Sequence, residues 1–363
     1  MKIWIGLGIV TILLLAGYFS APFWGGEEEG GGEIMIRRAA LGSKIRGLDP
    51  QDIGDTTSAA VAGQIFETLY TYRYLERPYT VIPLLARGMP EIASDGLTWR
   101  IGIKKGVVFA DDPCFPSGRG RELLADDFIY AWKRMADLHN RSTNYAAIFS
   151  GYHSGLDEFR KYTSRVETVD YDRPVAGLRA PDPYTIEITL SRPHNFLLYW
   201  LAHLPTAPVA REAVEYYRGD IVNHPVGTGP FLLEGDYRSN RFSMVRNKNF
   251  RESFYPRRGE AEDREEGLLR DAGRRIPFVD RIEWSIIEES QPLWLAFMAG
   301  KIDSSGIPKD NFPQAITREK ELSPRLKEKV VILEKRDDPS IFYYGFNMDD
   351  PVVGKNKPLR KAM

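Results

Sequence analysis

The stretch Gly227-Thr228-Gly229-Pro230-Phe231 forms a tight turn that leads into an apolar segment, 231–234. Its glycines permit positive φ values and the close approach of another group, and Pro230 fixes the exit direction. We expect a buried strand to follow. A turn whose amides face a cleft can hold a polar ligand without a charged side chain, although most such stretches are only turns. The flanking segments must therefore decide between these two interpretations.

Strands and helices are predicted to alternate on both sides of this turn. Apolar and polar residues alternate in segments 97–104, 184–190 and 282–286, which is typical of strands. Residues 55–58 (Asp, Thr, Thr, Ser) offer several N-caps for a helix with an apolar face that reaches Leu69, and Asp126 can cap a second one over 126–135. Another helix is expected over 291–299, ended by Gly300, before strands at 301–303 and 341–348; a last helix begins at Pro358. This interleaving indicates an α/β protein.

Composition limits the possible classes of function. A chain of 363 residues favours two domains, and its 43% hydrophobic content supports a packed core. Lys and Arg number 49 against 50 Asp and Glu, so there is no field for a nucleic-acid partner. Cys114 is the only cysteine, which rules out a disulfide within the chain. A mixed-charge segment over 257–275 is interpreted as a solvated excursion, with a partner-docking surface as the alternative.

The N-terminus predicts export from the cytoplasm. Residues 3–24 form an apolar run long enough to span a bilayer, and residues 25–32 form a flexible charged linker. A cleaved signal is the alternative, but Phe19 and Pro22 fit poorly around a cleavage site at Ala21. Tyr18 stands where a bacterial lipoprotein would carry its cysteine, which excludes lipidation there. We therefore expect an uncleaved membrane anchor and a body outside the cytoplasm.

The sequence contains none of several common motifs for catalysis or metal binding. The five histidines do not follow metal-ligand spacing, and the chain contains neither a Gly-x-Ser-x-Gly elbow nor a phosphate-binding loop. Asp126 and Asp127 are adjacent, so on a helix they point in different directions. We therefore expect no enzyme, no metal site and no cofactor.

A series of motifs resembles one family, the extracytoplasmic solute-binding proteins of oligopeptide and dipeptide ABC importers. In chain order the motifs are 48–50 (LDP), 65–70 (IFETLY), 83–86 (PLLA), 95–99 (DGLTW), 105–109 (KGVVF), 125–134 (ADDFIYAWKR), the turn at 227–231, 300–303, 346–347 and 359–362. Each motif alone is modest, and their shared order gives the resemblance its weight. The resemblance covers about residues 33–363.

The resemblance implies a two-lobed α/β fold, the type II periplasmic-binding-protein fold. Residues 33–285 would form the first lobe, with 55–178 as an inserted subdomain, and 286–363 would begin a second, incomplete lobe. The chain is thus interpreted as C-terminally truncated, and a large exposed apolar surface with poor solubility is expected.

The implied function is a tethered receptor that captures peptides, delivers them to ABC permease subunits in the membrane, and is monomeric when full length. The same fold could instead bind a nickel chelate, haem or an oligosaccharide. A membrane-anchored hydrolase is the disfavoured alternative.

By motif position, the candidate ligand contacts in the first lobe are Asp55 and Thr56 in one loop and Thr228 and Gly229 in the turn. Tyr145 and Phe231 are candidate walls of the cleft, with ordinary core packing as the alternative for such aromatics. The charged groups that recognise a peptide terminus in this family would lie beyond Met363. The sequence therefore does not predict which peptides are bound.

Overall fold

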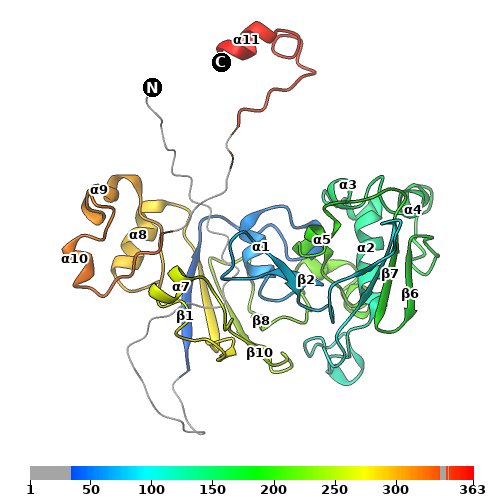
Figure 1. Cartoon of the computed structure of the whole chain (residues 1–363), viewed down its shortest axis with the longest axis horizontal. Helices are drawn as coiled ribbons and strands as arrows, with labels where there is room; N and C mark the ends of the chain where they lie inside the picture. The colour runs from blue at the N-terminus through cyan, green and yellow to red at the C-terminus, as the bar shows by residue number, and fades with distance from the viewer. Residues whose placement is uncertain (1–33, 336–340, 342) are drawn as a thin grey trace. The chain divides into compact units, whose positions relative to one another are not determined.

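The computed structural model describes residues 34–335, 341 and 343–363 (Figure 1). It divides into two compact units, and Pro308 is the last residue of the larger unit. The expected anchor and linker, 1–32, lie outside the described residues. Within the described part of the chain, no helix is both long and apolar enough to cross a membrane.

The first sheet joins segments that are far apart in the sequence. Its strand order is β1 (Ile36–Leu41), β12 (Arg281–Ile286), β9 (Arg241–Arg246) and β8 (Phe231–Glu234). β1 is parallel to β12, whereas the other pairs are antiparallel. In Figure 1 the blue β1 lies beside the yellow β12. Residues 42–280 therefore lie in the sequence between two strands, β1 and β12, that are neighbours in this sheet.

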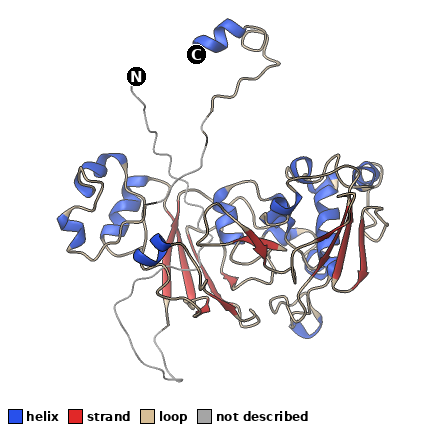
Figure 2. Cartoon of the chain, viewed as in Figure 1, coloured by secondary structure: helices blue, strands red, loops and turns tan. Residues whose placement is uncertain are grey.

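A second, antiparallel sheet lies within that intervening segment, with the order β4 (Glu91–Ile92), β5 (Thr98–Gly102), β7 (Thr185–Thr189) and β6 (Leu178–Asp182). The period-two predictions for β5 and β7 are confirmed, since Trp99, Ile101, Ile186 and Ile188 are buried. α2 (Ala125–Ala136) covers the inner face and packs against α4 (Leu156–Thr163) (Figure 2). This sheet continues to Thr189, beyond residue 178, where the inserted subdomain is expected to end.

The start of α2 differs from the expectation. Asp126 is exposed and does not cap the helix, whereas Asp127 is buried and accepts the Leu124 amide at 2.8 Å. The Asp127 carboxylate also accepts two hydrogen bonds from Arg121, at 2.7 and 2.9 Å. A buried carboxylate needs such partners, and Arg121 supplies them from the preceding loop. The choice between two adjacent aspartates is thus made by a tertiary contact.

The helix predicted after Asp55 is shorter than expected. α1 spans Thr56–Ala62, and of the candidate caps over 55–58 the structure uses Asp55. Beyond Ala62 the chain turns, yet Ile65, Phe66 and Leu69 remain buried as the apolar pattern indicated. The segment then enters the hairpin β2 (Tyr70–Tyr72) and β3 (Val81–Pro83).

Near the C-terminus the predictions hold for helices and fail for strands. α8 (Ser290–Met298) ends as expected, with Gly300 at φ 70°. Residues 301–303 form no strand, although the Asp303 amide donates to Arg38 O (2.9 Å) at the edge of β1. The described residues of 341–348 also form no strand, because no neighbouring strand supplies hydrogen bonds.

The remaining elements are short. The hairpin β10 (Ser253–Phe254) and β11 (Arg275–Ile276) closes the base of the mixed-charge excursion, which contains α7 (Ala261–Glu265). The other helices of the larger unit are α3 (Tyr145–Ile148), α5 (Leu197–Trp200) and α6 (Arg211–Tyr216). The smaller unit contains α9 (Phe312–Ala315), α10 (Pro324–Lys327) and α11 (Lys357–Ala362), the last of which confirms the helix predicted at Pro358. One-turn 3-10 helices connect these elements.

Candidate functional site

The loop before α1 carries two of the predicted ligand contacts. The Asp55 carboxylate accepts hydrogen bonds from the Ser58 amide and the Ser58 hydroxyl, both at 2.8 Å. The Asp55 side chain is therefore engaged as the N-cap of α1. Thr56, the first residue of α1, is exposed, and so is Gly54 just before the cap. The exposed part of this loop is thus its backbone together with the Thr56 side chain.

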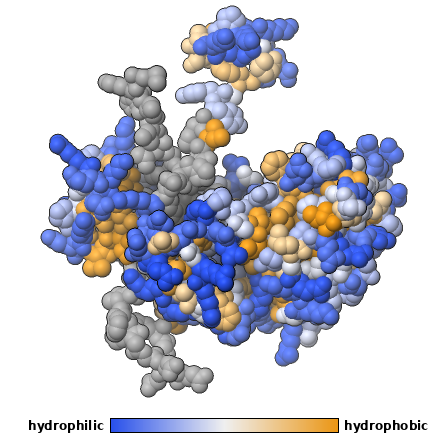
Figure 3. Space-filling view, in the orientation of Figure 1, coloured by the Kyte–Doolittle hydropathy of each residue, from blue (hydrophilic) through white to orange (hydrophobic). Residues whose placement is uncertain are grey.

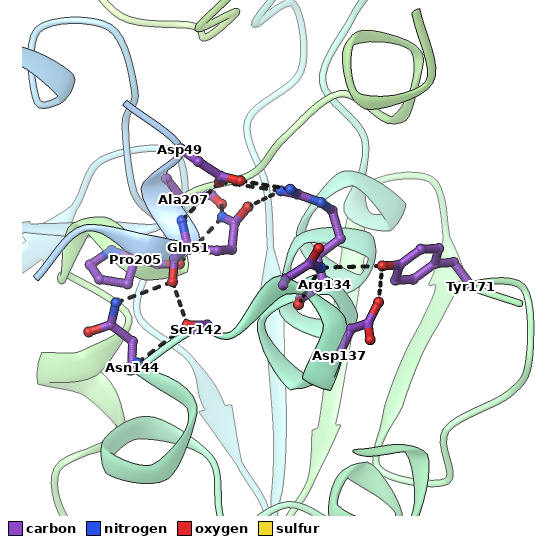
Figure 4. Close-up of polar contacts among 10 residues, drawn as sticks. Asp49, Gln51, Arg134, Asp137, Ser142, Asn144, Tyr171, Pro205 and Ala207 are labelled. Carbon is purple, nitrogen blue, oxygen red and sulfur yellow. Dashed lines mark hydrogen bonds and ion pairs between the residues drawn. The ribbon is translucent and has the colours of Figure 1, made fainter. Parts of the chain in front are cut away.

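Polar side chains next to α3 hold this loop in place (Figure 4). The Ser142 hydroxyl donates to Gln51 O at 2.5 Å. The Asn144 side-chain amide donates to Gln51 O at 3.2 Å and to Ile53 O at 3.0 Å. Residues 51–53 are consequently fixed to the segment that begins at Ser142, and Gly54 lies against Thr143.

A buried arginine holds the other side of the same loop. Arg134 of α2 is 4% exposed and donates to Asp49 Oδ2 at 2.7 Å and to Gln51 Oε1 at 2.6 Å. Burial disfavours the charged guanidinium, but the Asp49 carboxylate outweighs it and the pKa of Arg134 is raised. Gln51 in turn donates to Ala207 O at 3.1 Å. Figure 4 shows Asp49, Gln51 and Arg134 converging on one another.

Sequence reasoning missed this network, although its signal was present. Asp49 and Arg134 belong to two of the motifs that carry the family resemblance, and they have opposite charges. The pairing explains why an aspartate is placed before Pro50. These two motifs therefore contribute to positioning the loop before α1, through an ion pair between their side chains.

The glycine turn is packed against the chain that follows α1. The Gly229 amide donates to Ile65 O at 2.7 Å, and the Phe231 amide donates to Gln64 O at 3.0 Å. A Cβ atom at Gly227 or Gly229 would lie 2.1 or 2.6 Å from Ile65 O. Neither glycine has a positive φ. Of the two properties that these glycines permit, the structure uses the close approach of another backbone segment and not the positive φ.

Thr228, between those glycines, is tied to a buried ion pair. It is 3% exposed, and its hydroxyl donates to Glu67 Oε2 at 3.0 Å. Glu67 also accepts a two-pronged contact from Arg251, at 2.5 and 2.8 Å. Such bidentate pairs fix geometry as well as charge. Glu67 lies in the motif at 65–70, and its sequence context does not indicate this pairing.

The two predicted walls are buried in this structure. Phe231 starts β8 and is 3% exposed. Tyr145 is 2% exposed and donates its hydroxyl to Asp157 Oδ1 at 2.6 Å. Burial and that carboxylate raise the pKa of Tyr145, so the phenol stays neutral. Both side chains therefore lie beneath the surface.

α1 relates the two groups of predicted contacts. Asp55 and Thr56 stand at its start, and the turn bonds to Gln64 and Ile65 just after its end. A helix of seven residues is about 10 Å long. The loop and the turn are thus neighbouring features separated by one short helix.

The described residues contain neither a candidate metal site nor a reactive cysteine. No group of three or more His, Cys, Asp or Glu side chains there is placed to hold a metal ion. Cys114 is partly buried, and burial raises the pKa of its thiol, which disfavours the reactive thiolate.

Several known proteins are similar in sequence to this chain. The glutathione-binding protein GsiB of Salmonella choleraesuis (strain SC-B67) is 31% identical over 211 residues, which cover 58% of this chain and 34% of that protein. GsiB of Escherichia coli O1:K1 / APEC is 28% identical over 246 residues, covering 68% and 38%. The chain thus spans about a third of the length of the curated relatives it matches.

Solved structures share the fold at low identity. OppA of Burkholderia pseudomallei aligns with a TM-score of 0.58 at 21% identity, covering 78% of this chain and 48% of that one. OppA of Listeria monocytogenes bound to peptide gives 0.57 at 17%, covering 75% and 46%. DppA of Helicobacter pylori, in complex with the peptide STSA, gives 0.56 at 19%, covering 78% and 49%.

The family assignment rests on a match over most of the chain. The family model described as bacterial extracellular solute-binding proteins, family 5 (middle) matches residues 80–363. The α/β architecture agrees with the solved structures of such binding proteins. The chain therefore belongs to family 5 of the bacterial extracellular solute-binding proteins.

Proposed function

We propose that this protein is a receptor outside the cytoplasm that captures peptides and delivers them to an ABC import permease. The carrying observation is the family match over residues 80–363. The relatives named above are glutathione-binding proteins, and two of the solved structures hold peptides. In this role the protein binds its ligand without chemical turnover and works as a monomer when full length.

The proposed ligand contacts are the loop with Asp55 and Thr56 and the turn with Thr228 and Gly229. An extended peptide advances about 3.3 Å per residue, so about three residues bridge the 10 Å length of α1. Backbone groups held rigidly at two such points suit main-chain recognition, which is independent of peptide sequence. Arg134 and Glu67 hold the loop and the turn, respectively, in position. Tyr145 and Phe231 would contact ligand only after a local rearrangement that exposes them.

Ligands that copurify with the full-length protein, second lobe included, test the proposal. Mass spectrometry should recover peptides, and added glutathione should bind saturably, because the relatives carry that ligand in their names. Recovery of only sugars, haem or a nickel complex would contradict the peptide assignment. Peptide hydrolysis abolished by one side-chain substitution would instead support a membrane-anchored enzyme.

We also propose that residues 3–24 tether the receptor to the membrane that contains the permease. The support is the apolar run with aromatic residues at both ends. N-terminal sequencing of the exported protein tests this proposal. A mature N-terminus beyond Ala21 would refute the retained helix.

A further inference from the structure

A small hollow lies on the exposed face of the sheet β4-β5-β7-β6, and none of its lining residues is a proposed peptide contact. Its volume is about 150 Å³, and Arg87, Glu91, Arg100, Gly102 and Thr185 line it. Gly102 lies opposite Thr185 in the register of β5 and β7. The hollow exists because this position of β5 has no side chain to fill the face.

In the row of side chains next to the hollow, one carboxylate, that of Glu91, makes no ion pair among the described residues. Glu91, Arg100 and Glu187 lie opposite one another across β4, β5 and β7. Glu187 accepts Arg100 at 2.8 Å and Arg179 at 2.5 Å, so both arginines turn toward the same carboxylate. Glu91 faces Arg100 from the other side, and no ion pair forms between them within 4.0 Å among the described residues.

An arginine without an ion-pair partner covers the hollow. The Arg87 amide donates to Gly102 O at 2.7 Å, and its guanidinium lies 3.1 to 3.3 Å from the position of a Cβ on Gly102. Within the part of the chain that the structure describes, Arg87 has no carboxylate within 4.0 Å. Neither Arg87 nor Glu91 is held in a close ion pair among the described residues, although Asp182 lies within electrostatic range of Arg87 and Arg100 within that of Glu91.

We propose that this hollow binds a small zwitterion, of the class of free α-amino acids. The ligand carboxylate would accept hydrogen bonds from the Arg87 guanidinium, whose planar fork suits a carboxylate. The ligand ammonium would pair with Glu91. A volume of 150 Å³ is about that of five water molecules in the liquid, which is room for a small amino acid. Binding here is independent of the peptide contacts at α1.

Titration of the isotope-labelled full chain in mild detergent, followed by NMR, tests the proposal. Glycine should shift the amide signals of Arg87, Glu91 and Gly102 saturably. Acetate and methylammonium, which carry one charge each, should bind at least about tenfold more weakly, which corresponds to 1.4 kcal/mol. The absence of a saturable response to glycine would overturn the proposal. Equal affinity for acetate and glycine would overturn it too, as would shifts confined to 54–56 and 227–231.

Variants separate the hollow from the rest of the surface. Arg87→Gln and Glu91→Gln remove one charge each from exposed positions and should weaken glycine binding at least about tenfold. Gly102→Ala should also weaken binding, because its Cβ fills part of the hollow and shifts the Arg87 guanidinium; circular dichroism checks that this variant is folded. Arg238→Gln, another exposed arginine paired on its own turn, is the matched control. Wild-type affinity in either charge variant would overturn the assignment.

Discussion

The stability of the larger unit should fall as the pH drops below neutral, because of one histidine. His153 is 3% exposed, and neither ring nitrogen has a hydrogen-bond partner among the described residues. Its ring stands edge-on to Phe149 at 4.6 Å. Burial lowers the pKa of His153 from 6.5 to about 3. The Phe149 carbonyl, although it is outside hydrogen-bond geometry, opposes this shift, as does Asp157, whereas His194 lowers the pKa of His153 further.

The sign and size follow from proton linkage. The unfolded chain binds a proton near pH 6.5 and the folded chain only near pH 3, so the unfolded state gains protons first as the pH falls. The neutral imidazole therefore stabilises the fold fully above about pH 6.5, and this stability is lost toward about pH 3. At 1.36 kcal/mol per pKa unit, the loss between pH 7.5 and pH 5 is about 2 kcal/mol.

Urea unfolding of wild type and His153→Phe at pH 7.5 and pH 5 measures this loss. Phe cannot titrate and can pack against Phe149, so the variant should lose about 2 kcal/mol less than wild type between the two pH values. His139→Gln is the control, because His139 lies half exposed at the surface. Equal pH dependence of wild type and His153→Phe would refute the reasoning.

Three other perturbations address the loop, the turn and the exposed helix. Arg134→Met leaves Asp49 without its ion-pair partner and should reduce the free energy of unfolding by about 3–5 kcal/mol, with partial recovery in Arg134→Met/Asp49→Asn; no loss in urea unfolding would contradict the buried pair. Gly229→Ala places Cβ 2.6 Å from Ile65 O and should cost about 1–3 kcal/mol, whereas Gly42→Ala has no atom within 4 Å and should be neutral; equal effects would refute the close approach. Leu295 is 60% exposed on α8, where Figure 3 shows orange apolar surface, so Leu295→Lys should raise the saturation concentration of the chain. Unchanged solubility would show that this surface does not drive association.

Sequence patterns predicted the elements whose signals are local. Strands β5, β7 and β12 follow the alternation of apolar residues, and Gly300 ends α8. Exposed apolar side chains occur among the described residues, Leu295, Ile341 and Tyr344 among others, and the large apolar surface with poor solubility stays a prediction. These features depend on residues a few positions apart, which is the range over which periodicity carries information.

The failures share a different cause, the identity of a distant partner. Asp127, at the third position of α2, accepts the Leu124 amide in place of Asp126 because Arg121 holds its carboxylate, and Arg121 is in turn held by Glu212, 91 residues further along the chain. The 341–348 segment has strand composition and no strand beside it. The turn glycines are explained by Ile65 O, far away in the sequence. No local sequence rule selects among such partners. The position of the turn at 227–231 could therefore be predicted from the sequence, but the backbone segment against which it packs could not.

The pairing of β1 with β12 also sets a delay during synthesis. The Met35 amide and the Asp280 carboxylate at the start of that pairing are 245 residues apart. At about 5–20 residues per second, the ribosome needs roughly 10–50 s to produce the partner after β1 has emerged. During that time β1 is a strand without its partner, open to chaperones, proteases and other chains. For a chain of this family, which functions outside the cytoplasm, that interval is a natural opportunity for the export machinery to engage it before it folds.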